Sequence, residues 1–408
     1  MSTSLTDRPP TPAAVRPRSG WFRAFWRWHF YASFLVIPVL LVFAVTGLIY
    51  LFRFQLEPIL HADVMKVEQP AGSDVMQPYA GQQRAVERAH PDTTVVSMAE
   101  PRSEGRSTVF SVTEADGSGR DVFVDPWTAE VLGGLDPDTT LSGYAIRLHA
   151  DLMSGVVGDR VMELGTCWAL VMALTGYNGT SMWSLDHGAQ SSPTSTLDES
   201  LPHSHAEIPW GLQKSEVPDG AEPDDEVSVA NVDTAIAVGE REGLRHPMTV
   251  ALPADDAGTF SAIGYAFDQP SDERTVHVDR YGGAVRATYG YDEYPLLAKV
   301  VAQGIGLHEG RSLGVANMVA SAAFCLAVIA MCVTGPLMWW RRRPKGPRLG
   351  APRGRLPVRT TPVLAVGLVA LGVFLPLFGI SVVVVLLLDR FVLRRVPALG
   401  EFFGVSPS

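Results

Sequence analysis

Two stretches of the chain share one pattern, LHADLMSG at residues 148–155 and LHEGRSLG at residues 307–314. In both, a His follows a Leu, and a Gly comes six residues after that His. An apolar run follows and ends on a Thr-Gly pair, with Thr175 and Thr334 each 26 residues after the His. A soluble segment precedes each copy. The sequence therefore predicts an internal repeat in which a His heads an apolar helix.

The composition indicates a membrane protein. Of 408 residues, 47% are hydrophobic and only 19% are charged, and the mean hydropathy is positive, which is unusual for a purely soluble chain. Arg clusters flank the apolar runs and acidic residues crowd the stretches between them, so we expect no nucleic-acid partner. The three cysteines lie inside apolar runs and indicate neither a disulfide framework nor a thiolate metal site (Cys167, Cys325 and Cys332).

Three segments are predicted to be transmembrane helices. Residues 21–53 contain an uncharged run that can cross a bilayer core of about 30 Å, and they lack a small-residue cleavage site, so we expect a retained span and not a signal peptide. Basic residues before this span place the N-terminus in the cytoplasm. The two His-headed spans are 144–177 and 296–341. The flanking segments are a disordered cytoplasmic tail, a basic cytoplasmic loop, a C-terminal hydrophobic hairpin or single span, and a final tail (1–20, 342–361, 362–396 and 397–408).

Two soluble segments, 54–143 and 226–295, carry the same order of elements and are separated by a polar linker at 178–225. Each is predicted to begin with a helix, near 82–89 and 232–242. Alternating strands follow in each (94–99, 107–113 and 121–125 in the first; 248–252, 260–267, 274–279 and 285–288 in the second). The segments VFVDPWTAEV and VHVDRYGGAV match within this pattern. The expected fold is thus an α-helical polytopic membrane protein with two small α+β modules.

The repeat and the charges disagree on topology. Two parallel His-headed spans need a returning span between them, but no apolar run between residues 178 and 306 approaches the ~20 residues of a crossing. With three spans, the basic loop at 342–361 would also lie outside, against the positive-inside rule. One hypothesis is an internal deletion of one transmembrane helix. The alternative is that residues 161–177 do not cross.

The histidines are the main candidates for chemistry. His29, His149 and His308 lie at the ends of membrane helices, where ionisable groups are functional candidates. Two such imidazoles on neighbouring helices suit axial ligation of haem iron, whereas a single His there can equally well hydrogen-bond a carbonyl in the headgroup region. His203 and His205 could hold a metal with Glu207, although chance histidines in a solvated loop explain them better. The Thr-Gly pairs at Thr46, Thr175 and Thr334 could allow a helix or a cofactor to approach closely.

Four segments together resemble the PepSY-associated transmembrane family, the bacterial iron-regulated membrane proteins: Trp28–Tyr31, the two His motifs, and VTGPLMWWR at 333–341. The resemblance implies that both soluble modules are PepSY domains outside the cytoplasm of a multi-pass protein of the bacterial plasma membrane. Some members reduce ferric siderophores with haems held between transmembrane histidines. By position, His149 and His308 would ligate an extracytoplasmic haem b. His29 would ligate a second haem on the cytoplasmic side, whose other ligand would lie on the helix missing after Tyr177.

The resulting expectation is a haem-binding membrane reductase, a possible oxidoreductase that passes electrons from an unknown donor to ferric siderophores for iron uptake. Two alternatives are a non-enzymatic PepSY membrane protein that binds peptides or regulates a partner, and an inactive truncated family member. The sequence shows no nucleophile elbow, phosphate loop, dinucleotide fingerprint or HExxH, which argues against a soluble hydrolase or a nicotinamide enzyme.

Overall fold

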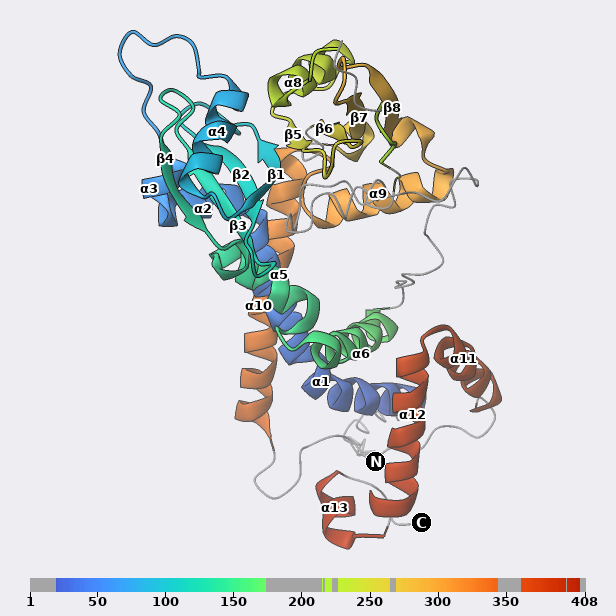
Figure 1. The fold of residues 1–408 in the computed structure, drawn as a ribbon. Helices are drawn as coiled ribbons and strands as arrows, with labels where there is room; N and C mark the ends of the chain where they lie inside the picture. Colours follow the sequence, from blue (N-terminus) through green and yellow to red (C-terminus); the bar gives the residue numbers. More distant parts are fainter. Residues whose placement is uncertain are drawn as a thin grey trace, which may run out of the picture. The chain divides into compact units, whose positions relative to one another are not determined.

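The computed structural model describes residues 20–173, 215, 217–221, 227–264, 269–343, 361–393 and 395–403 (Figure 1). The chain forms two compact units. The sheet unit comprises residues 41–159 and 176–330, and the helical unit comprises residues 1–40, 160–175 and 331–408. Helices α1 (Gly20–Leu51) and α10 (Val315–Arg342) contribute to both. Most of the predicted linker, with His203 and His205, lies outside the described residues.

One antiparallel sheet of eight strands organises the sheet unit, in the order β4-β3-β2-β1-β5-β6-β7-β8. The first half is β1 (Thr94–Ala99), β2 (Thr108–Thr113), β3 (Gly119–Val124) and β4 (Val131–Leu135). The second half is β5 (Thr249–Ala251), β6 (Thr259–Ile263), β7 (Arg274–Asp279) and β8 (Val285–Gly290). The halves join where β1 pairs antiparallel with β5, with Met98 opposite Val250. The two soluble segments expected from the sequence are therefore joined as two halves of one sheet.

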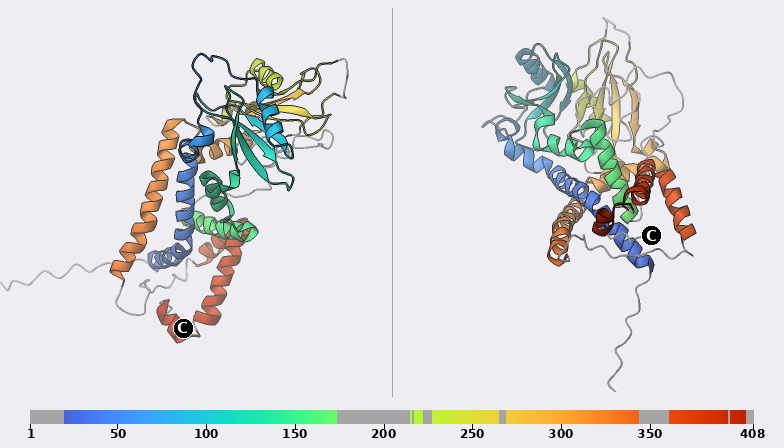
Figure 2. Two further views of the ribbon diagram at one scale, coloured as in Figure 1. Left: turned by 60° about the vertical axis from the view of Figure 1, so that its left-hand side comes forward. Right: turned by 90° about the horizontal axis from the view of Figure 1, so that it is seen from below.

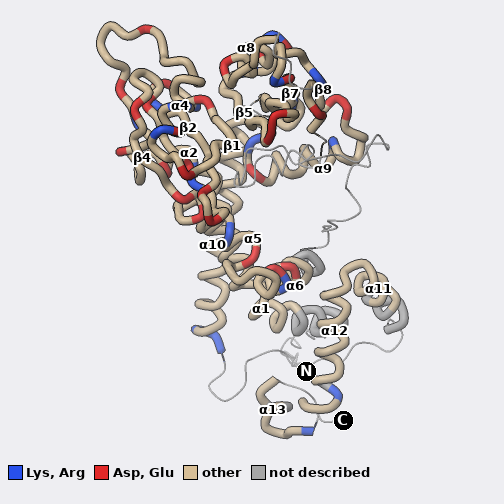
Figure 3. The backbone as a smooth tube through the Cα atoms, viewed as in Figure 1, with Lys and Arg blue, Asp and Glu red and all other residues tan. Residues whose placement is uncertain are grey.

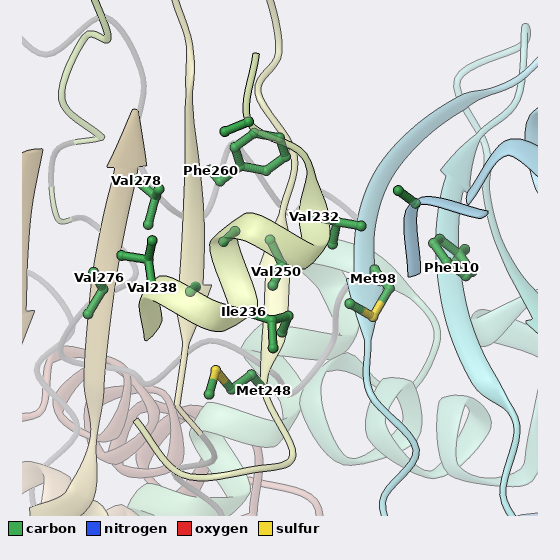
Figure 4. Packing of buried hydrophobic residues seen from close by; sticks show 14 of the residues in the cluster. Met98, Phe110, Val232, Ile236, Val238, Met248, Val250, Phe260, Val276 and Val278 are labelled. Atoms are coloured by element: carbon green, nitrogen blue, oxygen red, sulfur yellow. The ribbon is translucent and has the colours of Figure 1, made fainter. Parts of the chain in front are cut away.

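Helices α4 (Tyr79–Ala89) and α8 (Val232–Arg241) cover one face of this sheet, one for each half. Alternate strand residues point toward them, as the burial pattern of β2 shows. Figure 4 shows the resulting core, which runs without a break from Phe110 and Met98 of the first half to Ile236 and Val276 of the second. Asp233 of α8 also accepts hydrogen bonds from the backbone N–H groups of Tyr79 and Ala80, at 2.8 and 2.9 Å, and so caps α4 across the junction. The halves share both a core and a helix cap.

The matched segments of sequence form matched turns. Asp125 follows β3 and Asp279 is the last residue of β7, and the Oδ1 of each accepts a hydrogen bond from the N–H two residues later, at 2.8 and 3.0 Å. A register shift accompanies each turn, in the β3–β4 and the β7–β8 pairs. The predicted strand positions are confirmed within a few residues. Strand β4 was not predicted, because Gly133 and Gly134 in its middle weaken the strand pattern.

Helix α9 (Leu296–His308) packs on the other face of the second half. Its small residues Ala298 and Ala302 contact Ala251 and Ile263 of the sheet, in a cluster that also contains Tyr294. Helix α8 and helix α9 therefore sandwich strands β5 to β7 between them (Figure 1).

The predicted His-headed helices are each divided in two, which corrects the expectation of single helices over 144–177 and 296–341. Helix α5 (Leu141–Asp151) ends at Leu152, whose φ of 55° is left-handed, and α6 (Gly155–Ala173) begins after it. Helix α9 ends at His308, and Gly310 and Gly314 take φ values of 76° and 58° before α10 begins. Left-handed residues end α-helices. Each His thus lies at the end of a short helix that precedes the apolar one.

Three described helical segments are long and apolar enough to cross a membrane: His29–Leu51, Val315–Arg342 and Pro376–Leu393. Helix α6, which contains Asp159, Arg160 and Glu163, is not among them. Helices α1 and α10 lie side by side (Figure 2): Cys325 Sγ would be 3.7 Å from a Cβ added at Gly47, and Cys332 Sγ is 3.7 Å from the Ile37 carbonyl oxygen. Charged residues gather on the sheet unit, whereas α10 is uncharged until its last turn (Figure 3).

In the helical unit, the C-terminal hydrophobic segment is two helices, α11 (Thr361–Phe374) and α12 (Pro376–Leu388), broken at Leu375. Gly372 and Gly379 allow their backbones to touch, since a Cβ on Gly379 would lie 2.5 Å from the Gly372 carbonyl oxygen. This geometry is that of a hairpin, one of the two forms expected from the sequence. Helix α6 packs in the same unit, where Trp168 Nε1 donates to Ser381 Oγ at 2.9 Å.

Candidate functional site

His149 lies in the last turn of α5, and the beginning of that helix is fixed by a buried carboxylate. Glu57, on α2 (Arg53–Leu60), accepts hydrogen bonds from the backbone N–H and the hydroxyl of Ser142, at 2.6 and 2.7 Å. Thr140 caps the same helix by accepting from the Gly143 N–H at 3.0 Å. A carboxylate at a helix N-terminus satisfies free N–H groups and is favoured by the helix dipole. Helix α2 directly follows α1, so this contact holds α5 against the end of the first span.

The imidazole of His149 contacts the first span directly. Its Nδ1 is 2.8 Å from Thr46 Oγ1, and Thr46 in turn donates to the Val42 carbonyl at 2.6 Å. Because the Thr46 proton is used in that second bond, Thr46 accepts from His149, which places the imidazole proton on Nδ1 and leaves Nε2 with a free lone pair. The Phe43 ring packs against the imidazole with centroids 4.7 Å apart. The side chain is thus held in one orientation and one tautomer, as expected of a metal-ligating His.

His308 is the last residue of α9, and the turn that follows it is fixed by hydrogen bonds and close packing. Asn317, in the first turn of α10, donates to the carbonyl oxygens of Gly306 and Leu307, at 3.3 and 3.1 Å. Gly310 has a φ of 76°, and a Cβ there would lie 2.5 Å from Leu51 Cδ2. This position therefore needs glycine both for its backbone conformation and for the close approach of the end of α1.

A charged cluster connects this turn to the sheet. Arg311 donates to Glu309 at 2.6 Å and forms an ion pair with Glu273, at the start of β7, at 3.5 Å. Tyr294 donates to the other oxygen of Glu273 at 3.3 Å. Glu273 is only 2% exposed, and burial raises the pKa of its carboxyl to about 7, although the Arg311 guanidinium offsets part of that rise. The sheet thereby fixes the turn that carries His308.

The fold brings His149 and His308 together. Their ring centroids are 6.1 Å apart and their planes meet at 60°. A metal–imidazole bond is about 2 Å long, and a ring nitrogen lies roughly 1.1 Å from the ring centroid because ring bonds are about 1.35 Å. Two imidazoles on opposite sides of one iron therefore have centroids about 6 Å apart. The separation fits axial ligation of a haem, whose porphyrin supplies the four remaining ligands.

The other candidates stand apart from this pair. His29 is exposed on α1 and belongs to the helical unit, whereas His149 and His308 belong to the sheet unit. The segment expected to supply its partner after Tyr177 lies outside the described residues. No group of three or more His, Cys, Asp or Glu able to hold a metal ion occurs in the described part of the chain.

A comparison with family models identifies the chain. The model of the PepSY-associated TM region matches residues 26–184 and 200–342, which is most of the chain and includes both His motifs. The chain belongs to the PepSY-associated TM family. No curated protein gave a significant match. Membership confirms the resemblance drawn from the motifs and agrees with the candidate membrane spans.

Sequence reasoning identified the two histidines of this PepSY-associated TM protein but missed the residues that position them. Thr46 was singled out only as part of a Thr-Gly pair, and its hydrogen bond to His149 spans 103 residues of sequence. Glu57 and Glu273 were not identified at all. Their one sequence signal is a carboxylate at the edge of an apolar segment, which many solvated residues share.

Proposed function

We propose that the protein holds a haem b between His149 and His308 and passes electrons to ferric chelates outside the cytoplasm, as a ferric-siderophore reductase does. The observation that carries the proposal is the pair itself. Two imidazoles from separate segments, 159 residues apart, have ring centroids 6.1 Å apart, which would allow both to bind one haem iron. A purely structural His in each repeat would satisfy its polar atoms locally and would not need this juxtaposition.

The surrounding residues suit a haem ligand pair. Thr46 fixes the Nδ1 proton of His149 and so leaves the lone pair of Nε2 available to bind an iron. Glu57 holds the start of α5, the helix that carries His149. The Arg311–Glu273 ion pair holds the turn after α9, the helix that ends at His308. A haem bound here would supply one-electron transfer, so that one electron converts the Fe³⁺ of a chelate to Fe²⁺. The protein's part is to orient the ligands and to keep the site at the outer end of α1 and α10.

The sheet supports an extracytoplasmic position for both halves. A continuous sheet cannot have strands on both sides of a bilayer, so the chain between residues 143 and 226 crosses an even number of times. Since no apolar run after residue 178 is long enough to return, zero crossings is the simplest number. In agreement, the described helix α6 (Gly155–Ala173) is not among the candidate spans.

With α1 leading out and α10 leading back, Arg341 to Arg343 are cytoplasmic, in agreement with the positive-inside rule. This topology removes the conflict found in the sequence without a deleted helix. Reporter fusions at residues 225 and 350 test it, and a cytoplasmic signal at residue 225 would refute it.

A visible spectrum tests the cofactor. Detergent-purified protein, expressed with ample haem, should show a six-coordinate b-type spectrum that sharpens on reduction with dithionite. His149→Ala and His308→Ala should each abolish it. His90→Ala is the matched control, because His90 is the C-cap residue of α4 and is not one of the two proposed ligands. A colourless parent protein, or haem retained by both variants, would rule out the proposed ligand pair.

The acceptor is tested separately. Protein reduced anaerobically with limiting dithionite should be reoxidised when a ferric hydroxamate chelate is added, with Fe²⁺ trapped by a ferrous-specific dye. The gallium chelate is the control, since Ga³⁺ has the same charge and coordination but accepts no electron under these conditions. Haem that binds but is not reoxidised would leave a haem protein without this reductase activity.

A further inference from the structure

Helix α9 has two sharply different faces. Its buried face consists of Ala298, Ala302 and Gly306, which pack toward the sheet. The opposite face is apolar and exposed, with Leu296, Leu297, Val300 and Leu307 between 45% and 80% exposed. These four residues fall on one side of a helix with 3.6 residues per turn, and we call them the outer face of α9.

Two polar residues of α9, Lys299 and Gln303, lie on its flank. Lys299 is half-buried, and its Nζ donates to the Asp292 carbonyl at 3.0 Å while it packs over the Tyr291 ring. Gln303 also lies at the edge of the exposed side, near the Tyr291 hydroxyl. Neither side chain interrupts the outer face. A helix in water would normally carry its charges on that side.

The position of α9 is fixed relative to a membrane span. Only six residues separate its last residue, His308, from the first residue of α10, and Asn317 hydrogen-bonds the carbonyls of its last turn. Ser312 also donates to the Gln303 carbonyl at 3.4 Å. Figure 1 shows α9 running across the direction of α10 where α10 begins. The helix is therefore held beside the start of α10.

Exposed apolar surface continues from α9 onto that span. Leu313, Val315 and Val319 are 58% to 70% exposed at the start of α10, which is one of the candidate membrane helices. At thirteen residues, α9 extends about 20 Å and is too short to cross the hydrocarbon core. A short helix with one apolar face beside a span has the features of a helix that lies in the plane of the interface.

We propose that α9 lies in the extracytoplasmic interface of the bilayer, with its outer face against the lipid chains. Lipid is the occupant because the outer face is continuous with the lipid-exposed start of α10. The helix thus lies between the sheet and the lipid chains, and it holds the turn that follows His308 at the level of the headgroups. The proposal does not depend on whether haem is bound.

Three valines of nearly equal exposure allow a matched test in the full chain. Val300 is 59% exposed on the outer face, Val319 is 58% exposed on the span, and Val229 is 61% exposed in the segment just before α8. Each is replaced by Cys, labelled with an environment-sensitive nitrobenzoxadiazole dye, and reconstituted into phosphatidylcholine nanodiscs. The parent chain, whose three cysteines lie in apolar helices, sets the labelling background.

Two quenchers then distinguish the environments. Brominated lipid should quench the dye at residues 300 and 319 but not at 229, and aqueous iodide should do the reverse. Emission from residue 300 should also be blue-shifted relative to residue 229. Leu296→Cys, at the 80% exposed beginning of the same face, provides a second position if Val300→Cys does not fold.

The outcomes decide between lipid and other occupants. Iodide quenching at residue 300 equal to that at 229 would show that the outer face is in water. Protection at residue 300 from both quenchers would show that protein covers it, as a second copy or a partner would. Either result would overturn the proposal.

Discussion

Replacing Glu273 with Gln should stabilise the sheet unit at pH 8 and leave its stability unchanged at pH 5. Glu273 is almost fully buried and pairs with Arg311 and Tyr294. Burial raises the pKa of its carboxyl from an ordinary value near 4.5 to about 7. The folded chain therefore binds this proton more tightly than the unfolded chain does. The resulting stability is complete below pH 4.5 and is lost as pH rises through about 7.

The size of the effect follows from the shift. A rise of roughly 2.5 pKa units corresponds to about 3 kcal/mol between the two protonation states. The parent chain should lose up to that amount between pH 5 and pH 8, whereas the neutral Gln side chain loses none of it. With a urea slope of about 3 kcal/mol per molar, the variant should unfold at a urea concentration about 1 M higher than the parent at pH 8.

Pulse proteolysis over a urea series measures this stability in detergent, with fragments of the sheet unit identified by mass spectrometry. Glu240→Gln is the control, because Glu240 is exposed on α8 and should leave the pH dependence unchanged. Parent and Glu273→Gln proteins with the same dependence between pH 5 and 8 would refute the reasoning. A variant less stable than the parent at pH 8 would show that the Arg311 ion pair outweighs the desolvation of Glu273.

Three further substitutions test the contacts around the histidines and at the junction of the two halves. Thr46→Val removes the acceptor for His149 Nδ1, so haem affinity in a titration should fall about 10- to 100-fold. Gly310→Ala forces a side chain into a left-handed position against Leu51, so the urea midpoint should report a loss of about 1–3 kcal/mol. Asp233→Ala removes the cap of α4, so hydrogen exchange in that helix should speed up by an amount equivalent to about 1–2 kcal/mol.

Each of these has its own control. Thr46→Ser retains the hydroxyl and should restore haem affinity, while Thr166→Val removes a similar hydroxyl that only bonds its own helix, at Met162. Unchanged affinity in Thr46→Val would mean that this hydroxyl does not orient the ligand. Gly72 has a φ of 85°, but a Cβ added there would meet no atom within 4 Å, so Gly72→Ala should reduce the stability less than Gly310→Ala does. Exchange that stays slow in α4 of Asp233→Ala would show that the shared core alone fixes the junction.

Local signals in the sequence were enough for the strands but not for their assembly. Alternation and the matched segments that contain Asp125 and Asp279 predicted the positions of most strands, because these features depend on near neighbours. The pairing of β1 with β5 depends on Met98 facing Val250, a contact across about 150 residues that no local pattern encodes. The sequence therefore indicated two modules where one sheet forms.

The predicted helix boundaries were wrong for a similar reason. Residues 152–155 and 309–314 continue an apolar or helix-compatible pattern, so the sequence indicated continuous His-headed helices. The breaks require left-handed residues, and Leu152 and Met153 are not residue types that signal one. At Gly310 the signal was present, since glycine marks such positions. The pairing of His149 with His308 was inferred from the repeat and the family resemblance, and their proximity now supports it.

The long separation between β1 and β5 has a consequence for biogenesis. When β1 emerges from the ribosome, about 150 further residues must be synthesised before β5 can pair with its free edge. At roughly 5–20 residues per second, that interval is about 8–30 s. Throughout it, the first half presents an unpaired edge at what will be the centre of the sheet, where other strands could add. Completion of the second half is therefore the step that protects the nascent chain from mispairing, and truncations between residues 140 and 245 should be the forms most prone to aggregate.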